Sequence, residues 1–194
     1  MAPPERRRYW TGMFFTVGHG ARTTEELQAV LEEARVRRCV DVRRYPASRR
    51  HPHFARQALE RSLPGAGIAY EWWGEELGGR RRARPVAETR HPAWQVEAFR
   101  AYAEYMDTPS FRQAFEKLLA IARGTDVAVM CAETLWWQCH RRLLADAATL
   151  HGMQVLHLGI GREPRPHRLH EAARAEEGGW PVYDVGVLPL RRPG

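Results

Sequence analysis

The chain carries two distinct periodicities of apolar and polar residues. Short, mostly apolar runs have the length of buried strands, and they lie at 14–17, 39–42, 68–71, 127–130 and 155–158. Other stretches have apolar residues at helical spacing. They predict a helix after Thr23 and further helices over 55–63, 94–106, 109–122 and 139–151. Strands are therefore expected to alternate with helices along most of the chain.

Two of the predicted helices have capping residues at their starts. Thr23 is followed three positions later by Glu26, which predicts a capping box. Thr108 precedes Pro109, and Gly124 lies just past the expected end of that helix. Residues 74–92 are rich in Gly, Arg and Pro and lack any period, so they predict a long loop.

The order of elements predicts an α/β fold, a single domain with a central, mainly parallel sheet and helices on both faces. The length of 194 residues suits one such domain. We divide the chain into a basic N-terminal arm (1–13), the α/β domain (14–160) and a C-terminal segment (161–194) that wraps the same domain. Ligands of such sheets bind at the carboxyl ends of the strands. Residues that directly follow a strand are therefore the candidates for a site.

Positive charge is concentrated in two stretches of the chain. The formal net charge is +7, and only one of the 30 lysine and arginine residues, Lys117, is lysine. Residues 35–61 contain nine arginines against two acidic residues, and residues 80–90 contain five against one. Such clustering favours a polyanion or a phosphorylated ligand, because arginine binds phosphate bidentately. We therefore expect DNA or a nucleotide as the partner.

Several features bear on the cellular location. No apolar run approaches the roughly 18–20 residues that a membrane-spanning helix needs. The N-terminal arm lacks the apolar segment of a secretory signal. The three cysteines form no disulfide framework. Together these features predict a cytoplasmic protein without membrane contact.

The first candidate site follows the first predicted strand. Gly18 and Gly20 would let the backbone approach a ligand closely. His19 between them could act as an acid, a base or a phosphate donor. The alternative is a tight turn in which His19 caps a neighbour. The glycine pattern of dinucleotide-binding turns is incomplete, because Thr23 occupies its third glycine position.

The second candidate site follows the second strand. Asp41 comes after buried strand residues and is a candidate catalytic carboxylate. Arg43, Arg49 and Arg50 could clamp an anion beside it. The alternative is that Asp41 pairs with one of these arginines and only fixes the loop.

The third candidate site follows the fourth strand. Cys131 ends this strand, Glu133 follows, and Cys139, His140 and Arg141 lie at the start of the next helix. The helix N-terminus lowers the pKa of a thiol, so Cys139 could be a nucleophile with a histidine partner. A metal bound by both cysteines and a histidine is a second possibility, although the spacing is not a familiar zinc spacing. A third possibility is that both cysteines are packing residues of the core.

Tryptophan pairs flank these loops at residues 72–73 and 136–137. Aromatic rings beside arginines can stack on unpaired bases. The alternative is that each pair packs a loop against the sheet.

Four ordered motifs together resemble domain of unknown function family 488: TVGHG, CVDVRRYPASRRHPHF, ELGG, and CAE followed by CHRR. The resemblance covers residues 14–160 and implies an α/β fold with a site lined by these motifs. The family pattern falls on Gly18, His19, Asp41, Arg43, Pro46, Ser48, Arg49, Phe54, Leu77, Gly78, Gly79, Cys131, Glu133, Cys139, His140 and Arg141. Gly20 stands where the family usually has Ser, which removes a hydroxyl donor. The family name states no activity.

These observations predict an enzyme that acts on nucleic acid or nucleotides. The expected reaction is hydrolytic release of a base, as by a DNA glycosylase in DNA repair. Carboxylates would activate water and offset an oxocarbenium-like charge, arginines would bind phosphates, and aromatic rings would hold a flipped base. Two alternatives stay open. One is a thiol-dependent enzyme of a small phosphorylated metabolite with Cys139 as nucleophile, and the other is a non-catalytic nucleic-acid-binding module.

The predicted site residues form three groups. The catalytic candidates are Asp41, Glu133, His19 and Cys139. The candidates for binding substrate or phosphate are Gly18, Arg43, Ser48, Arg49, Arg50, His53, Gly78, Gly79, His140 and Arg141. The candidates for base stacking are Phe54, Trp136 and Trp137. No metal and no cofactor are expected.

Overall fold

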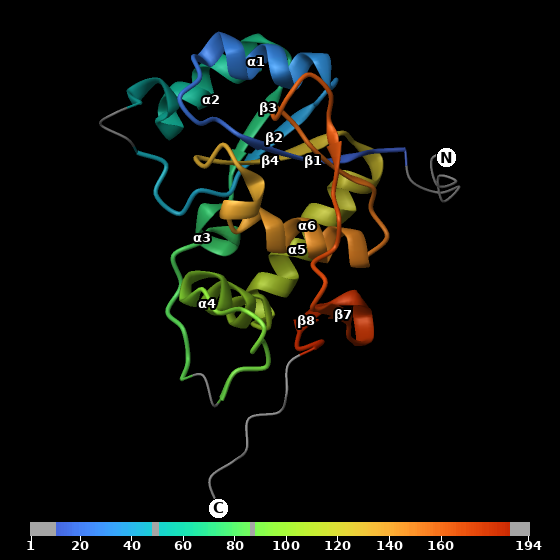
Figure 1. Cartoon of the computed structure of the whole chain (residues 1–194). Coiled ribbons are helices and arrows are strands. Elements are labelled where there is room, and N and C mark those ends of the chain that lie inside the picture. The colour runs from blue at the N-terminus through green and yellow to red at the C-terminus, as the bar shows by residue number, and fades with distance from the viewer. Residues whose placement is uncertain (1–10, 48–50, 86–87, 187–194) are drawn as a thin grey trace, which may run out of the picture.

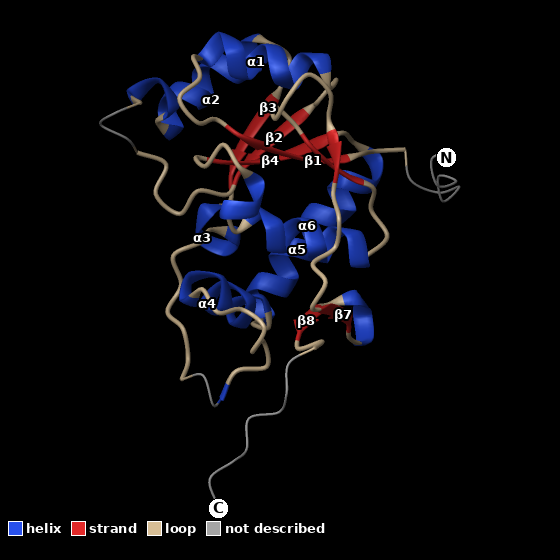
Figure 2. Cartoon of the chain, viewed as in Figure 1, coloured by secondary structure: helices blue, strands red, loops and turns tan. Residues whose placement is uncertain are grey.

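A computed structural model describes residues 11–47, 51–85 and 88–186 of the chain. Its centre is a six-stranded sheet with the order β3-β2-β4-β1-β5-β6 (Figures 1 and 2). The first five strands are β1 (Phe14–Gly18), β2 (Arg38–Asp41), β3 (Ala69–Trp72), β4 (Val127–Cys131) and β5 (Val155–His157). Neighbours among these five pair in parallel, and only the two-residue β6 (Arg165–Pro166) is antiparallel. The predicted mainly parallel sheet is confirmed.

Helices cover both faces of this sheet, as expected. Helices α1 (Thr24–Glu33) and α2 (Arg56–Gly65) lie on one face, above the sheet in Figure 1. Helices α4 (Glu97–Met106), α5 (Pro109–Gly124) and α6 (Arg141–Leu150) lie on the other side. Since each crossover helix must return the chain to a parallel strand, this arrangement buries the sheet on both sides.

Alternation along the strands divides the core into two apolar layers. In β1, Phe14 packs with α5 residues such as Phe115, whereas the next residue, Phe15, packs on the side of α1 with Leu27 and Leu31. Successive side chains of a strand point to opposite faces. Both faces of β1 and β4 are apolar for this reason, and all five residues of each strand are buried.

The helix starts follow the predicted capping chemistry. The Thr23 side chain accepts a hydrogen bond from the Glu26 backbone N–H, and Glu26 accepts one from the Thr23 N–H in return. The Thr108 side chain caps α5 by accepting a hydrogen bond from the Phe111 N–H. These bonds satisfy backbone donors that have no partner within the helix.

Some of the chain differs from the sequence-based expectation. The predicted loop 74–92 begins with one helical turn, α3 (Gly74–Leu77). The C-terminal segment contains a second, two-stranded sheet of β7 (Ala173–Ala175) and β8 (Pro181–Tyr183), which we did not predict. Short 3-10 turns lie at η1 (Pro52–Phe54), η3 (Trp136–Gln138) and η4 (Glu177–Gly179). All these elements are too short to show a period in the sequence.

A chain of buried polar groups attaches the C-terminal segment to the core. Asp146 on α6 accepts hydrogen bonds from His167 at 2.8 Å and from the Tyr183 hydroxyl at 2.9 Å. His167 in turn lies 3.0 Å from the ring nitrogen of His157 on β5. Asp146 has no exposed surface, so these partners replace the water that its carboxylate loses.

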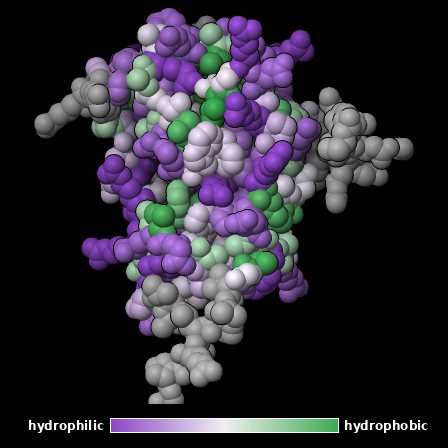
Figure 3. All heavy atoms as spheres, in the orientation of Figure 1, coloured by the Kyte–Doolittle hydropathy of each residue, from purple (hydrophilic) through white to green (hydrophobic). Residues whose placement is uncertain are grey.

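Within the described ranges, no helix is both long and apolar enough to cross a membrane. Figure 3 shows hydrophilic side chains over much of the face that it presents, with only small separate apolar areas.

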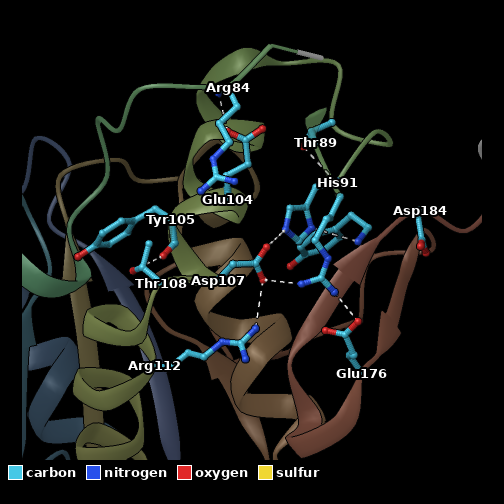
Figure 4. Close-up of polar contacts among 12 residues, drawn as sticks. Arg84, Thr89, His91, Glu104, Tyr105, Asp107, Thr108, Arg112, Glu176 and Asp184 are labelled. Atoms are coloured by element: carbon cyan, nitrogen blue, oxygen red, sulfur yellow. Dashed lines mark hydrogen bonds and ion pairs between the residues drawn. The ribbon is translucent and has the colours of Figure 1, made fainter. Parts of the chain in front are cut away.

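A second polar cluster holds the long loop against the helices. Asp107, at the end of α4, lies 3.0 Å from His91, 3.2 Å from Arg112 and 3.6 Å from Arg90 (Figure 4). Arg90 also pairs with Glu176 of the C-terminal segment. Asp107 and Arg90 together therefore join the long loop, the start of α5 and the C-terminal segment.

Replacing Asp107 by Asn should lower the free energy of unfolding at neutral pH by about 1–2 kcal/mol, because one charged acceptor serves three donors. Burial raises the pKa of Asp107, but His91 and the two arginines outweigh it and hold this pKa below its usual value. The stabilisation is therefore present at neutral pH and is lost as the pH falls through the range in which this carboxyl is protonated.

Urea unfolding at pH 7 and at pH 3 would measure this effect. Asp184→Asn is the matched control, since Asp184 pairs with Arg174 at the surface and should contribute clearly less. Equal losses in the two variants, or a loss in Asp107→Asn that does not depend on pH, would contradict the assignment.

Candidate functional site

The site lies where the chain leaves β1 and β4 in opposite directions. These strands are neighbours in the sheet, but β1 leads to α1 on one face and β4 leads toward α6 on the other (Figure 1). The two loops stay paired for a short distance, since the His19 N–H donates to the Cys131 carbonyl at 3.0 Å and the Gly20 N–H donates to that of Ala132 at 2.9 Å. Such a divergence opens a crevice at the carboxyl ends of the strands.

A pocket of about 350 Å³ occupies this region. Its wall has a basic part with Arg43, Arg44 and Arg80 and a thiol part with Cys131, Cys139 and His140. Glu133, Gly79 and Tyr102 also line it. Loops that follow β2, β3 and β4 thus contribute to one cavity, whereas Gly18 and His19, which follow β1 and were predicted in the same place, do not line it.

The basic part of the wall depends on a buried ion pair between Asp41 and Arg43. The Asp41 carboxylate accepts hydrogen bonds from the backbone N–H, Nε and Nη2 of Arg43, with the shortest at 2.5 Å. It also accepts one from the Tyr70 hydroxyl at 2.7 Å. Asp41 has no exposed surface, and it does not line the pocket as Arg43 does. The pairing of Asp41 with an arginine, which the sequence left as an alternative, is therefore what this geometry shows.

His19 completes this network on the other side of Arg43. Arg43 Nη1 donates to His19 Nε2 at 3.1 Å, and His19 Nδ1 lies 2.9 Å from the Gly20 carbonyl. Because a guanidinium only donates, Nε2 must be the unprotonated nitrogen. Burial, followed by the charge of Arg43, lowers the pKa of His19 to about 4. His19 is therefore neutral at pH 7, and its ring stacks on Phe54 with centroids 4.2 Å apart.

The thiol part of the wall contains an unequal pair of cysteines. Cys139 Sγ lies 3.5 Å from His140 Nδ1. Burial opposes ionisation of Cys139, but a hydrogen bond from Cys131 and the neighbouring His140 and Arg141 side chains outweigh it and place the pKa of Cys139 well below the usual value. The same hydrogen bond and burial raise the pKa of Cys131. Of the two sulfurs, Cys139 is therefore the one whose surroundings favour the thiolate.

These two cysteines and His140 also have the composition of a metal site. Their ligand atoms all lie within 4.8 Å of one another, and thiolate with imidazole suits zinc. A metal-bound histidine normally donates its other ring N–H to a second partner. In the described part of the chain, however, the buried His140 Nε2 has no hydrogen-bond partner. The donor set fits a metal, whereas its surroundings lack this support.

Arg141 does not face the pocket as a phosphate ligand would. It is 1% exposed, and its Nη2 donates to the backbone carbonyls of Glu133 and Thr134. Gly18 lies against the same loop, since a Cβ on Gly18 would approach the Glu133 carbonyl oxygen to 1.9 Å. Arg141 and Gly18 therefore fix the loop 132–138 in place.

The other predicted site residues lie around the pocket rather than in it. His53 contacts the Arg22 carbonyl at 3.1 Å, and Gly78 packs closely on Arg44. Phe54 is fully buried, and Trp136 stacks on His157 with centroids 3.9 Å apart. Trp137 is 37% exposed. The base-stacking roles of these rings stay predictions, and Ser48, Arg49 and Arg50 lie outside the described residues.

Several residues that line the pocket were not predicted from the sequence. Arg44, Tyr45 and Arg80 border the pocket, and Tyr102 packs its ring at 4.9 Å from that of His140. Arg44 and Tyr45 directly follow Arg43, so proximity in sequence was an available signal. Tyr102 comes from a helix that carries none of the motifs, and only the folded chain reveals it.

Comparison with known proteins gives one match. A family model described as "Domain of unknown function DUF488" matches residues 23–148, which is well over half of the chain. No curated protein and no solved structure matches. The match includes the residues of both the basic and the thiol parts of the pocket.

The lowered pKa of Cys139 predicts a distinct pH dependence of its alkylation. An ordinary thiol with a pKa of about 8.5 reacts roughly tenfold more slowly for each pH unit below that value. Cys139 should instead react with iodoacetamide at nearly the same rate from pH 8 to pH 6, because the thiolate persists. Peptide mass spectrometry measures the rate at each cysteine separately.

Cys39 is the internal control for this measurement. It is fully buried among apolar residues, and burial raises its pKa, so it should stay unmodified while the protein is folded. A rate at Cys139 that falls tenfold per pH unit below pH 8 would contradict the thiolate assignment.

Proposed function

We propose that this protein, which belongs to the DUF488 family, is a thiol-dependent enzyme whose Cys139 attacks a small phosphorylated substrate. The observation that carries the proposal is the position of Cys139 in a pocket that also contains three arginines. A nucleophile and an anion-binding wall in one cavity are the two parts that such an enzyme needs.

Arg43 supports the proposal because it retains donors for a ligand. A guanidinium has five N–H groups, and the contacts with Asp41 and His19 use one on each nitrogen. One N–H on each terminal nitrogen is left for an anion. Asp41 and His19 would thus act as positioning residues, which hold Arg43 with its free donors at the pocket.

Arg44 and Arg80 support an anionic substrate through their charges. Arg44 donates to the Glu75 carbonyl, which carries no formal charge, and Arg80 lies with its guanidinium 5.8 Å from the Tyr45 ring. Among the described residues neither arginine forms an ion pair, and positive charge at a pocket raises the local concentration of anions.

The chemistry follows from these positions. The Cys139 thiolate would form a bond to an electrophilic carbon of the bound substrate and displace a leaving group. Glu133 on the same wall is the candidate to supply a proton to that leaving group. Water would then attack the covalent intermediate and return a proton to Glu133, which would release the product and restore the thiolate.

Protection of Cys139 from alkylation tests the proposed substrate class. Inorganic phosphate and a panel of phosphorylated sugars should slow the reaction with iodoacetamide in wild type, because they would occupy the arginine-lined pocket. Arg80→Ala should raise the concentration needed for protection by about fivefold to tenfold, as expected for the loss of one charge-assisted contact.

Arg82→Ala is the matched control, since Arg82 is also exposed but does not line the pocket. Its protection curve should match that of wild type. Mass spectrometry after incubation with the panel should also find a covalent adduct on Cys139 that is absent from Cys139→Ser. If no phosphorylated compound protects Cys139, or if Arg80→Ala changes nothing, this function is wrong.

Action on DNA or a nucleotide is the second candidate, and one observation favours it. A larger hollow of about 770 Å³ adjoins the pocket and shares Arg44 and Tyr45 with it. Tyr45 is 65% exposed, and Arg56 lies 4.7 Å over the ring of Trp72 in this hollow. Exposed aromatic rings beside arginines are typical of surfaces that bind unpaired bases.

Hydrolytic release of a base by Asp41 and Glu133 has weaker support than binding of DNA or a nucleotide has. The two Asp41 oxygens already accept four hydrogen bonds, so neither is free to orient a water molecule. Glu133 is exposed at the pocket and remains available as a proton carrier in either candidate reaction.

Affinity for single-stranded DNA should fall steeply between low and moderate salt if the hollow binds nucleic acid, because neutralised phosphates release counterions. Arg56→Ala should weaken binding and reduce the salt dependence. Arg61→Ala, on the exposed surface of the same helix but away from the hollow, should have little effect. An affinity that does not change with salt, or equal losses in both variants, would exclude this surface.

A further inference from the structure

The proposed reaction leaves Cys131 without a role, although it is the nearest thiol to the nucleophile. Cys131 is the last residue of β4, and Cys139 lies just before α6. The loop 132–138 joins them, and both side chains line the same pocket. The third cysteine, Cys39, belongs to the apolar layer under α1 and α2 and does not line the pocket.

The distance between the two sulfur atoms permits a bond. They lie within 4.8 Å of each other, whereas a disulfide requires about 2.05 Å. The difference is within the reach of two side-chain rotations. Arg141, which follows the loop, donates to the Glu133 carbonyl at its start, and Gly18 packs against the same carbonyl. This bond joins the start of the loop to the beginning of α6, so the two cysteines stay near each other while these rotations occur.

The two sulfurs are chemically unequal, and this inequality suits a two-step exchange. Cys139 Sγ lies 3.5 Å from His140 Nδ1, which favours the thiolate of Cys139, and negative charge on Cys139 in turn raises the pKa of Cys131. Cys139 is therefore the sulfur that attacks first. Once Cys139 is no longer a thiolate, this constraint on Cys131 disappears, and Cys131 can ionise.

We infer that Cys131 is the resolving thiol of Cys139, and that a low-molecular-weight disulfide converts the pair into an internal disulfide that reversibly switches off the site. The inference rests on the proposed function only for the nucleophilic Cys139. It adds a partner residue and a regulation of that site.

The exchange balances in two steps. The Cys139 thiolate attacks one sulfur of the external disulfide, forms a mixed disulfide and releases the first thiolate. Cys131 then loses its proton to solvent and attacks Cys139 Sγ, which forms the internal bond and expels the second thiolate. The two cysteines lose two electrons, and the external disulfide gains them as two thiols.

Glutathione disulfide is the probe for this exchange, because its carboxylates match the arginines of the pocket wall. The reduced full-length protein is incubated with it in the absence of oxygen, quenched with acid and mapped by peptide mass spectrometry. In wild type we expect a bond between Cys131 and Cys139 and loss of alkylation at Cys139. Dithiothreitol should restore that alkylation completely.

Variants then separate the two steps. Cys131→Ser should stop the reaction at a stable mixed disulfide on Cys139, and Cys139→Ser should give neither product. Cys39→Ser is the matched control and should behave as wild type. The wild-type map does not depend on any variant, so it decides the question even if a substitution prevents folding.

Two results would overturn the inference. One is a wild-type protein that accumulates the mixed disulfide on Cys139 while Cys131 stays a free thiol. The other is a stoichiometric zinc ion in the purified protein that both cysteine variants lose, since both sulfurs would then be ligands. If Cys139 is alkylated rapidly but no internal disulfide forms, only the role of Cys131 is contradicted. If Cys139 is unreactive, the proposed function is contradicted as well.

Discussion

The buried ion pair between Asp41 and Arg43 is the interaction on which the site depends. It fixes the direction of the guanidinium, and the guanidinium in turn determines which nitrogen of His19 carries the proton. The Trp72 indole donates to the Arg43 carbonyl at 2.9 Å, which ties the end of β3 to the same residue. Loss of one partner of such a pair costs about 3–5 kcal/mol, because the other charge is left buried. The ends of β1, β2 and β3 are therefore all held by contacts with Arg43 and its carboxylate partner.

The pocket combines two kinds of electrostatic environment across a short distance. On one side, Arg43 is compensated by a carboxylate yet still offers donors. On the other side, Cys139 is surrounded by groups that stabilise its negative charge. An anionic ligand held by the arginines would lie beside a thiolate, and like charges repel. In the proposed reaction the arginines would have to bind the substrate strongly enough to offset this repulsion, and three of them line the cavity.

Much of the fold could be predicted from the sequence because its strands and helices are local patterns. The parallel strands, the helix N-caps and the helices on both faces follow from apolar spacing and from single residues such as Thr23 and Thr108. Arg43, Glu133 and Cys139 could be predicted to lie together because each follows the end of a parallel strand. The sequence could not show that Asp41 is saturated or that Arg141 points into the protein. Both facts depend on partners chosen by tertiary packing, such as Tyr70 and the Glu133 carbonyl. The strands β7 and β8 were missed because each has three residues and no period.

The position of Asp146 has a consequence for the order of events during protein synthesis. Its hydrogen-bond partners His167 and Tyr183 lie 21 and 37 residues later in the chain. Helix α6 and the sheet can therefore form on the ribosome before the groups that neutralise their buried carboxylate have been made. Until Tyr183 emerges, Asp146 lacks the hydroxyl that it binds in the folded protein, and the surface of α6 that β8 covers stays open to water. The nascent chain completes its core only when its C-terminal segment arrives, so a ribosome that stalls before that point releases an incompletely packed domain.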